Sequence, residues 1–211
     1  MKKRLSGLYA VTPENDHTEA LLHMVRKALI GSAATVQYRN KSGDVALQHE
    51  QASELLNLCR EYGAPLIIND NLRLADLIDA DGLHLGAEDS ALAEARIVLG
   101  PKKIIGVSCY NRLEDALEAQ QRGADYVAFG SFFTSPTKPH ATPASIALLH
   151  AATRLVHLPI VAIGGITLQN ASDLIDAGAD VIAVISSLFD APDIELAARA
   201  FNVLFEIESE E

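Results

Sequence analysis

The ten residues "GADVIAVISS" (178–187) combine a glycine-led turn, an apolar run and a pair of hydroxyls. The run that follows "GAD" has the length and the β-branched composition of a buried parallel strand. Glycine at position 178 is typical of the residue that ends a preceding helix. The same "GAD" precedes a second apolar run in "GADYVAFGS" (123–131). Each stretch therefore predicts the end of a helix, a tight turn and a buried strand.

The rest of the chain repeats this order. Apolar runs of strand length alternate with windows of helical periodicity, such as 44–62, where Val45, Leu55 and Cys59 share one face. Eight such pairs with right-handed crossovers close most naturally into a (β/α)8 TIM barrel. An open doubly wound sheet is the alternative, and the missing GxGxxG fingerprint counts against it. The expected strands are 7–12, 35–39, 65–70, 81–86, 103–110, 125–131, 159–165 and 181–187.

Length and composition fit one α/β domain. The chain has 211 residues, of which 49% are hydrophobic and 21% charged, and this is enough apolar material for a single barrel core. We therefore expect one TIM-barrel domain over residues 1–211, with the acidic segment "EIESEE" (206–211) as a solvated tail. The first residues are basic but lack the extended apolar region and the cleavage pattern of a secretory signal.

Charge and cysteine content exclude several classes of protein. A formal net charge of -11 disfavours a surface that binds nucleic acid or an anionic membrane, because such surfaces need clustered cations. No run approaches the roughly 18 to 20 apolar residues that span a bilayer. Cys59 and Cys109 lack the spacing of a zinc site or a disulfide framework, and unpaired cysteines are typical of a reducing compartment. We expect a cytoplasmic protein.

Polar residues gather at the carboxyl ends of the expected strands, which form the working face of a barrel. Gln37, Arg39 and Lys41 stand at alternate positions, so an extended backbone points all three in one direction. Singly, most such residues have ordinary roles: Asp70 can cap a helix, and His84 on an apolar strand is more often a core histidine than a ligand. Their convergence at seven strand ends favours one shared site.

The residue types at this face suit two phosphate groups. Asp70 and Asp89 provide the one or two carboxylates that Mg²⁺ takes in proteins, with water and phosphate oxygens as its other ligands. Arg39, Lys41 and Lys138 would surround such an ion with positive charge and bind a diphosphate. A second set of groups suits a monophosphate, because a Gly-Gly turn brings backbone N–H groups close to an anion and hydroxyls donate to it. This second set is Gly164, Gly165, Ser135 and Ser186.

Seven motifs follow one another in order and cover nearly the whole chain. They are "VQYRNK" (36–41), "IINDN" (67–71), "DGLHLGAED" (81–89), "IGVSCYN" (105–111), "GADYVAFGSFFTSPTK" (123–138), "IVAIGGI" (160–166) and "GADVIAVISS" (178–187). Together they give the chain a close resemblance to the thiamine-phosphate synthase family. The resemblance implies a barrel enzyme that uses Mg²⁺, joins a hydroxymethylpyrimidine diphosphate to a thiazole phosphate and releases pyrophosphate. Its partners would be these small-molecule substrates, with no nucleic acid and no membrane.

The same resemblance implies a role for each matched residue. Asp70 and Asp89 would bind Mg²⁺, and Lys138, Ser108 and Arg39 would act on the pyrimidine diphosphate as the catalytic set. The other residues that would hold this substrate are Gln37, Tyr38, Asn40, Lys41 and Asn69. Those that would hold the thiazole phosphate are Ser135, Pro136, Thr137, Gly165, Ile185 and Ser186. We expect pyrophosphate to leave before the new bond forms, and on this path no residue needs to act as a covalent nucleophile.

The chain departs from the family pattern at three places, and two other functions stay open. Many members have arginine at the position of Asn71, histidine at that of Tyr110 and "PTxTK" over 134–138. A related thiazole tautomerase would need no metal and would rely on that histidine, whereas a phenol is a poor proton shuttle near neutral pH. A barrel that only binds phosphate, as a carrier or a regulator, would release no pyrophosphate.

Overall fold

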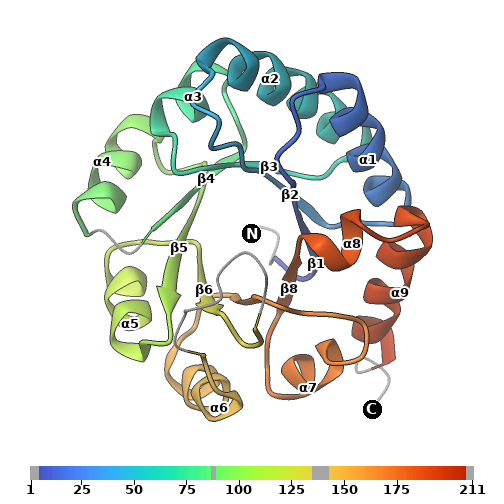
Figure 1. Ribbon diagram of the computed structural model, residues 1–211. Coiled ribbons are helices and arrows are strands. Elements are labelled where there is room, and N and C mark those ends of the chain that lie inside the picture. The colour runs from blue at the N-terminus through green and yellow to red at the C-terminus, as the bar shows by residue number, and fades with distance from the viewer. Residues whose placement is uncertain (1–4, 87–88, 135–142, 208–211) are drawn as a thin grey trace.

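Eight parallel strands close into a barrel in the computed structural model (Figure 1), which describes residues 5–86, 89–134 and 143–207, without the side chains of 89, 90 and 207. Each strand pairs with its neighbours in chain order, and β1 pairs with β8 to close the sheet. The TIM-barrel prediction is confirmed. The strands are β1 (Gly7–Val11), β2 (Thr35–Tyr38), β3 (Leu66–Asn69), β4 (Gly82–Leu85), β5 (Ile104–Tyr110), β6 (Tyr126–Gly130), β7 (Ile160–Ile163) and β8 (Val181–Val184).

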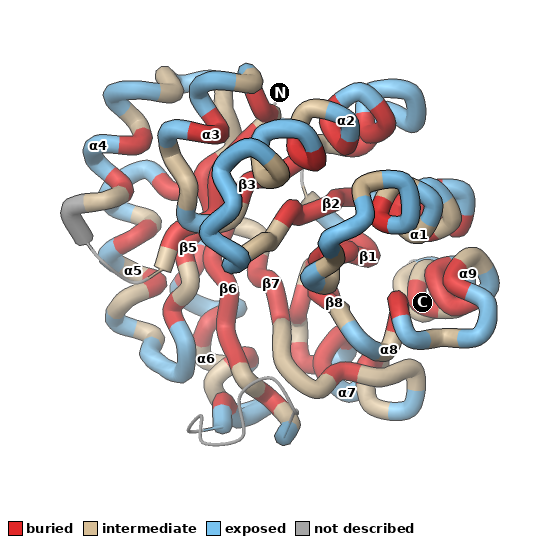
Figure 2. Tube along the Cα trace, turned by 45° about the horizontal axis from the view of Figure 1, so that its top comes forward, coloured by how far each residue is buried: buried red, intermediate tan, exposed pale blue. Residues whose placement is uncertain are grey.

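Helices cover the outer face of this barrel and turn their buried sides inward (Figure 2). None of the helices in the described part of the chain is both long enough and apolar enough to cross a membrane. They are α1 (Thr18–Ile30), α2 (Val45–Tyr62), α3 (Leu72–Leu77), α4 (Asp89–Leu99), α5 (Leu113–Gln121), α6 (Ile146–Leu155), α7 (Ala171–Asp176), α8 (Ser186–Phe189) and α9 (Ile194–Ile207).

Three boundaries show how the expected elements begin and end. The window 44–62 forms α2, and the Asp44 carboxylate caps it by accepting the Leu47 N–H at 3.0 Å. The expected last strand, 181–187, stops at Val184 because the chain turns into α8 there. The acidic tail was predicted to begin at residue 206, which is too early, because α9 continues to residue 207. Residues 208–211 lie outside the described part of the chain.

The predicted helix ends at Gly123 and Gly178 are confirmed, and the same turn occurs at three more places. At each, a residue with positive φ donates its N–H to the carbonyl three residues earlier, and the following alanine donates to the carbonyl five residues earlier. These two hydrogen bonds together form the Schellman motif. The buried alanine then leads the chain into the next strand. The five pairs are Ser32-Ala33, Gly63-Ala64, Asp79-Ala80, Gly123-Ala124 and Gly178-Ala179.

Aspartates hold the amino-terminal ends of neighbouring strands together. The carboxylates of Asp81, Asp125 and Asp180 precede β4, β6 and β8 and accept an N–H from the first or second residue of β3, β5 and β7. Each of these hydrogen bonds is 2.9 Å long. The polar side chains at this end of the barrel are therefore used for structure, as expected of the face opposite a TIM-barrel active site.

The barrel has two apolar layers. The larger one lies between the strands and the surrounding helices and contains most of the buried leucine, isoleucine and valine side chains. The smaller one fills the barrel interior and includes two tyrosines, Tyr9 and Tyr126. Gly106 on β5 leaves space for the Tyr126 ring, because a Cβ atom at position 106 would lie 1.9 Å from the Tyr126 Cζ atom. A tyrosine hydroxyl this deep needs hydrogen-bond partners, and these lead to the site.

Candidate active site

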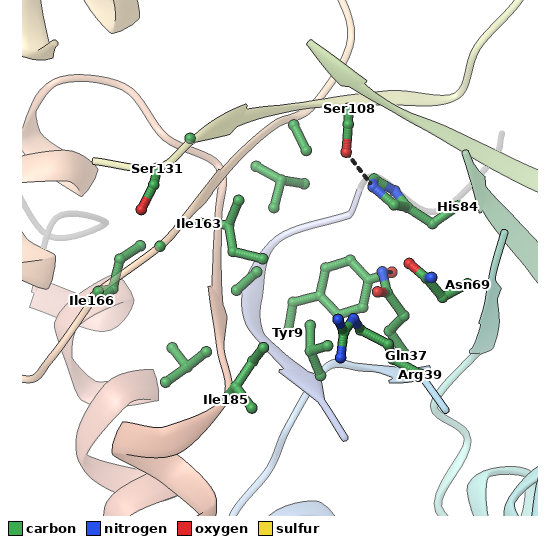
Figure 3. A pocket seen from close by; sticks show the side chains of 18 of the residues that line it. Tyr9, Gln37, Arg39, Asn69, His84, Ser108, Ser131, Ile163, Ile166 and Ile185 are labelled. Atoms are coloured by element: carbon green, nitrogen blue, oxygen red, sulfur yellow. Dashed lines mark hydrogen bonds between the residues drawn. The ribbon is translucent and has the colours of Figure 1, made fainter. Parts of the chain in front are cut away.

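A cavity of about 440 Å³ opens at the carboxyl ends of the strands (Figure 3). All eight strands, or the loops that directly follow them, contribute lining residues. The cavity contains many of the residues that the sequence singled out. These are Gln37, Arg39, Lys41, Asn69, Asp70, Ser108, Gly164, Gly165, Ile185 and Ser186.

The two sides of the cavity differ in chemistry (Figure 3). Gln37, Arg39 and Asn69 form a polar side with His84 and Ser108, above strands β2 to β5. The opposite side, at the ends of β6 to β8, is more apolar: Ile163, Ile166 and Ile185 line it, with the hydroxyls of Ser131 and Ser186 at its edge. The cavity can therefore hold one charged, hydrogen-bonding ligand part next to an apolar one.

Alternation along β2 sorts the "VQYRNK" residues into two groups. Gln37, Arg39 and Lys41 line the main cavity, as the period of two predicts. Tyr38 and Asn40 instead both donate to the Gln51 Oε1 atom of α2, at 2.8 and 3.2 Å. They line a second hollow beside the first, of about 310 Å³, together with Lys41.

The charged side chains at the ends of β2 and β3 are open to a ligand. Lys41 and Asp70 are exposed, while Arg39 is 22% exposed and its Nη1 atom lies 3.3 Å from the Glu14 Oε1 atom. The Asp70 backbone has a φ of 57°, a conformation that aspartate tolerates better than most residues. Its N–H donates to the His84 carbonyl oxygen at 2.8 Å, and its carboxylate accepts from the Asn69 amide at 2.8 Å. These bonds hold the Asp70 carboxylate at the rim.

Five expected site residues lie wholly or partly outside the described part of the chain. Asp89 is the first residue of α4, and its side chain is not described. The other four lie in the 135–142 segment, outside the described residues: Ser135, Pro136, Thr137 and Lys138. Thr134, the last described residue before that segment, does line the cavity. The loop after β6 thus leaves the barrel at the site.

The Gly164-Gly165 turn has a role in packing, separate from the anion binding expected of it. A Cβ atom on Gly164 would lie 2.0 Å from the Ser131 Oγ atom, so only glycine lets the loops after β6 and β7 meet. The Phe133 N–H donates to the Gly164 carbonyl oxygen at 3.0 Å across this contact. Ser186 is exposed to the cavity, whereas the Ser187 hydroxyl donates to the Ile166 carbonyl oxygen at 2.7 Å.

A hydrogen-bonded row beneath the polar side was missed by the sequence analysis. His84 bridges the Tyr126 hydroxyl at 2.9 Å and the Ser108 hydroxyl at 2.8 Å. The Tyr126 hydroxyl also lies 2.9 Å from that of Tyr9, which accepts from the Gln37 amide at 2.9 Å. Burial raises the pKa of both tyrosines well above the usual range, so both stay neutral. The available signal was inward-facing tyrosines on two strands, which require partners.

Comparison with known proteins identifies close relatives. A family model described as thiamine monophosphate synthase matches residues 8–188. A thiamine-phosphate synthase of Thiobacillus denitrificans is 61% identical over 205 residues, which cover 97% of each chain. One of Nitrosospira multiformis is 50% identical over 208 residues, or 99% of this chain and 89% of the relative.

Solved structures agree with this family. The thiamine phosphate pyrophosphorylase from Pyrococcus furiosus superposes with a TM-score of 0.85 and 36% identity, covering 95% of this chain and 96% of that one. A 3-hexulose-6-phosphate synthase structure has a TM-score of 0.70 at 18% identity, covering 95% of this chain and 99% of that one. This second likeness shows the shared barrel fold alone.

Proposed function

This chain belongs to the thiamine monophosphate synthase family, and from that membership and its cavity we propose the reaction that it catalyses. It is a transferase that forms thiamine phosphate and releases pyrophosphate. One observation carries the assignment to this site: a charged, hydrogen-bonding side and an apolar side share one cavity at the strand ends. A pyrimidine diphosphate and a thiazole phosphate need such a pair of surroundings within reach of each other.

The polar side would hold the pyrimidine diphosphate. Gln37, Asn69 and Ser108 offer the donors and acceptors that match the edge of a heteroaromatic ring. Arg39 and Lys41 lie next to them and would bind the diphosphate through charge-assisted hydrogen bonds. For Tyr38 and Asn40 we propose an indirect part: through Gln51 they fix the loop between β2 and α2 that carries both cations.

The apolar side would hold the thiazole phosphate. Ile185 and Ile163 provide a surface for the ring, and the Gly165 backbone and the Ser186 hydroxyl are the donors available to its phosphate. The loop after β6 would complete this side. We assign to it Ser135, Pro136 and Thr137, because Thr134 already lines the same cavity.

The donor set at the ends of β3 and β4 fits a magnesium ion. Asp70 offers an exposed carboxylate beside the two cations, and Asp89 begins the helix that follows the neighbouring strand. Both are hard oxygen donors, and Mg²⁺ typically takes one or two carboxylates and completes its shell with water and phosphate. When bound, the ion supplies positive charge that stabilises pyrophosphate as a leaving group.

We propose that the protein's own residues promote ionisation and then alignment. Arg39 and Lys41 hold the diphosphate, and Lys138 neutralises the charge that develops as pyrophosphate leaves. The exocyclic methylene of the pyrimidine becomes cationic, with charge shared by the electron-rich aminopyrimidine ring beside Ser108. The thiazole nitrogen, held on the apolar side, then forms the new C–N bond. Stabilisation of charge and proximity of the two rings are sufficient for this path.

The assay that tests the proposal is pyrophosphate release by the purified protein with both substrates and Mg²⁺. We expect release that requires both substrates and stops when a chelator removes the metal. The tautomerase alternative has no support among the relatives compared, which are named as synthases. Conversion of the thiazole substrate alone, without metal, would favour that isomerase, and binding of thiazole phosphate with no pyrophosphate formed would favour a carrier. A cytoplasmic location remains our proposal, in keeping with two free, buried cysteines.

A further inference from the structure

Five side chains from five strands form one continuous row of hydrogen bonds below the cavity. The row starts at Gln37 on β2 and passes through Tyr9 on β1 and Tyr126 on β6. It continues through His84 on β4 and ends at Ser108 on β5. Both end residues line the cavity on the side assigned to the pyrimidine, and Figure 3 shows the His84 to Ser108 bond at its wall. The two tyrosines at its centre are at most 1% exposed.

Counting hydrogens gives this row a direction. The Gln37 amide nitrogen can only donate, so the Tyr9 oxygen accepts from it. Each tyrosine has one hydroxyl hydrogen. If Tyr9 donates to Tyr126, then the Tyr126 hydrogen goes to the Nδ1 atom of His84, and every contact in the row has a donor and an acceptor. In the opposite arrangement Tyr9 would accept twice, and its own hydrogen would need an acceptor that the row does not contain.

The direction extends to the end of the row. A neutral imidazole that accepts at Nδ1 carries its hydrogen on Nε2. That hydrogen is then donated to the Ser108 oxygen, 2.8 Å away. Ser108 is left with its own hydroxyl hydrogen to offer to the cavity. The Tyr126 ring also stacks on the imidazole, with centroids 5.6 Å apart and planes 16° apart, which holds the ring orientation.

We propose that Tyr9, Tyr126 and His84 are positioning residues that fix the direction of the Ser108 hydroxyl hydrogen, so that Ser108 donates it to an acceptor atom of the substrate. This inference rests on the proposed function, in which the pyrimidine lies against Ser108. At the other end, Gln37 donates one of its two amide hydrogens to Tyr9, which fixes the orientation of the amide and leaves its carbonyl oxygen able to accept. With Ser108 as donor and the Gln37 oxygen as acceptor, the two ends match a ligand edge that carries one acceptor and one donor, as the ring nitrogen and amino group of an aminopyrimidine do.

The first test determines which ring nitrogen of His84 carries the hydrogen, and it does not depend on enzyme activity. In protein labelled with ¹⁵N at histidine, nitrogen chemical shifts distinguish a protonated from an unprotonated ring nitrogen. The His84 signals are those lost in a His84→Asn spectrum. We expect the neutral ring to carry its hydrogen on Nε2, and we expect the Nδ1 signal to shift in Tyr126→Phe. A hydrogen on Nδ1 in the wild-type protein would overturn the inference, even if the protein releases pyrophosphate as proposed.

The second test asks whether Tyr126 acts through Ser108. Tyr126→Phe keeps the stacked ring and removes one hydroxyl, and we expect about a tenfold loss in kcat/KM for the pyrimidine substrate. KM for thiazole phosphate should stay within about twofold. In a Ser108→Ala background the same replacement should change kcat/KM by less than about twofold, because the group it positions is gone. Equal losses in both backgrounds would show that Tyr126 does not act through Ser108.

Controls separate this role from folding and from the proposed reaction. Thr35→Val also removes a buried hydroxyl from a barrel strand, at the opposite end of β2, and should leave the kinetics unchanged. Thermal melting of every variant reports stability. If Tyr126→Phe does not fold, Tyr9→Phe breaks the row one bond earlier and should give the same pattern. A wild-type protein without pyrophosphate release would reject the proposed function, and the histidine spectra would still decide the direction of the row.

Discussion

Asp70 is the described residue on which the proposed metal site depends most directly. We expect Asp70→Asn to lower turnover by about 100-fold or more, because the change removes a charge from the metal side of the diphosphate. Asparagine tolerates the φ of 57° at this position, so the melting temperature should change little. Pyrophosphate release, measured over a range of Mg²⁺ concentrations, checks the prediction.

Asp79 offers a matched control for that change. It also has a positive φ, 54°, and is exposed, but it lies in the turn before β4, at the other end of the barrel. Its carboxylate pairs with the Lys103 ammonium, which lowers the pKa of the Asp79 carboxyl. Asp79→Asn should therefore cost a little stability and no activity. An Asp70→Asn enzyme with normal turnover and an unchanged Mg²⁺ requirement would contradict the proposed ligand role.

This fold needs glycine for two reasons, a positive φ and a lack of space for a side chain, and two of its glycines allow them to be tested separately. Gly123 has a φ of 88° and open space around its Cα, so Gly123→Ala meets a backbone cost alone, about 1 kcal/mol. Gly106 faces the Tyr126 ring, and Gly106→Ala would overpack the barrel interior at a cost of about 3 kcal/mol. Urea unfolding of both variants measures this difference. Equal losses would mean that the interior yields to the added methyl group.

The site residues found from the sequence are those whose roles follow from local rules. Gln37, Arg39 and Lys41 could be placed together because strand periodicity alone fixes their common direction. His84 could not be assigned, because its partners Tyr126 and Ser108 come from other strands. Sequence periodicity tells which side chains point inward, but it does not tell which of them touch once eight strands close.

At the level of elements, the same limit explains which turns could be predicted. The "GAD" turns before β6 and β8 were visible because glycine marks the left-handed position. The equivalent turns at Ser32 and Asp79 were not, since these residues adopt that conformation less often and give no clear signal. The alanine that follows in all five turns was available as a repeated signal, and its burial explains why a small side chain stands there.

The end of α4 depends on one side chain. Both terminal nitrogens of Arg96 are used: they donate to the carbonyl oxygens of Gly100, Lys103 and Gly123, at 2.8 to 3.0 Å, and to the Asp125 carboxylate at 2.7 Å. The same Asp125 carboxylate accepts the N–H of Ile105, the second residue of β5, at 2.9 Å. Arg96 thus connects one helix to two strand beginnings, at the end of the barrel away from the cavity.

Arg96→Met should lower the free energy of unfolding by about 2 kcal/mol, because several charge-assisted bonds are lost and Asp125 keeps a partly buried charge. Activity at saturating substrate should not change, since the cavity lies at the other end of the strands. Arg199→Met is the control: its pair with Glu195 is exposed on α9, and the loss should stay below about 0.5 kcal/mol. Equal effects of the two substitutions would refute a special role for Arg96.

Seen as a whole, the molecule separates stability from chemistry along the barrel axis. At the amino-terminal end of the strands the polar side chains are paired with backbone groups, as with Asp81, Asp125 and Asp180. At the carboxyl end, Lys41, Asp70 and Ser186 are exposed to a cavity. Two apolar layers lie between these ends, and they enclose the titratable groups that make the whole barrel sensitive to alkali.

Five buried groups should make the protein less stable as the pH rises. Burial raises the pKa of the Cys59 and Cys109 thiols and of the Tyr38 hydroxyl to about 12. It raises the pKa of the Tyr9 and Tyr126 hydroxyls as well. Above the ordinary thiol value the unfolded chain loses these protons while the folded protein keeps them. The folded state then binds more protons than the unfolded state, so the free energy of unfolding must fall with increasing pH.

The thiol part of this effect can be measured separately. Between about pH 8 and about pH 10 each buried cysteine should remove about 1.4 kcal/mol, the equivalent of one pH unit, from the free energy of unfolding. Urea unfolding under reducing conditions should therefore show a fall that is about 3 kcal/mol smaller in the Cys59→Ala, Cys109→Ala double variant. The three buried tyrosines should produce the fall that remains in that variant. If wild type and double variant lose the same stability over this range, the thiols do not stay protonated in the folded barrel, and their burial does not control its alkaline limit.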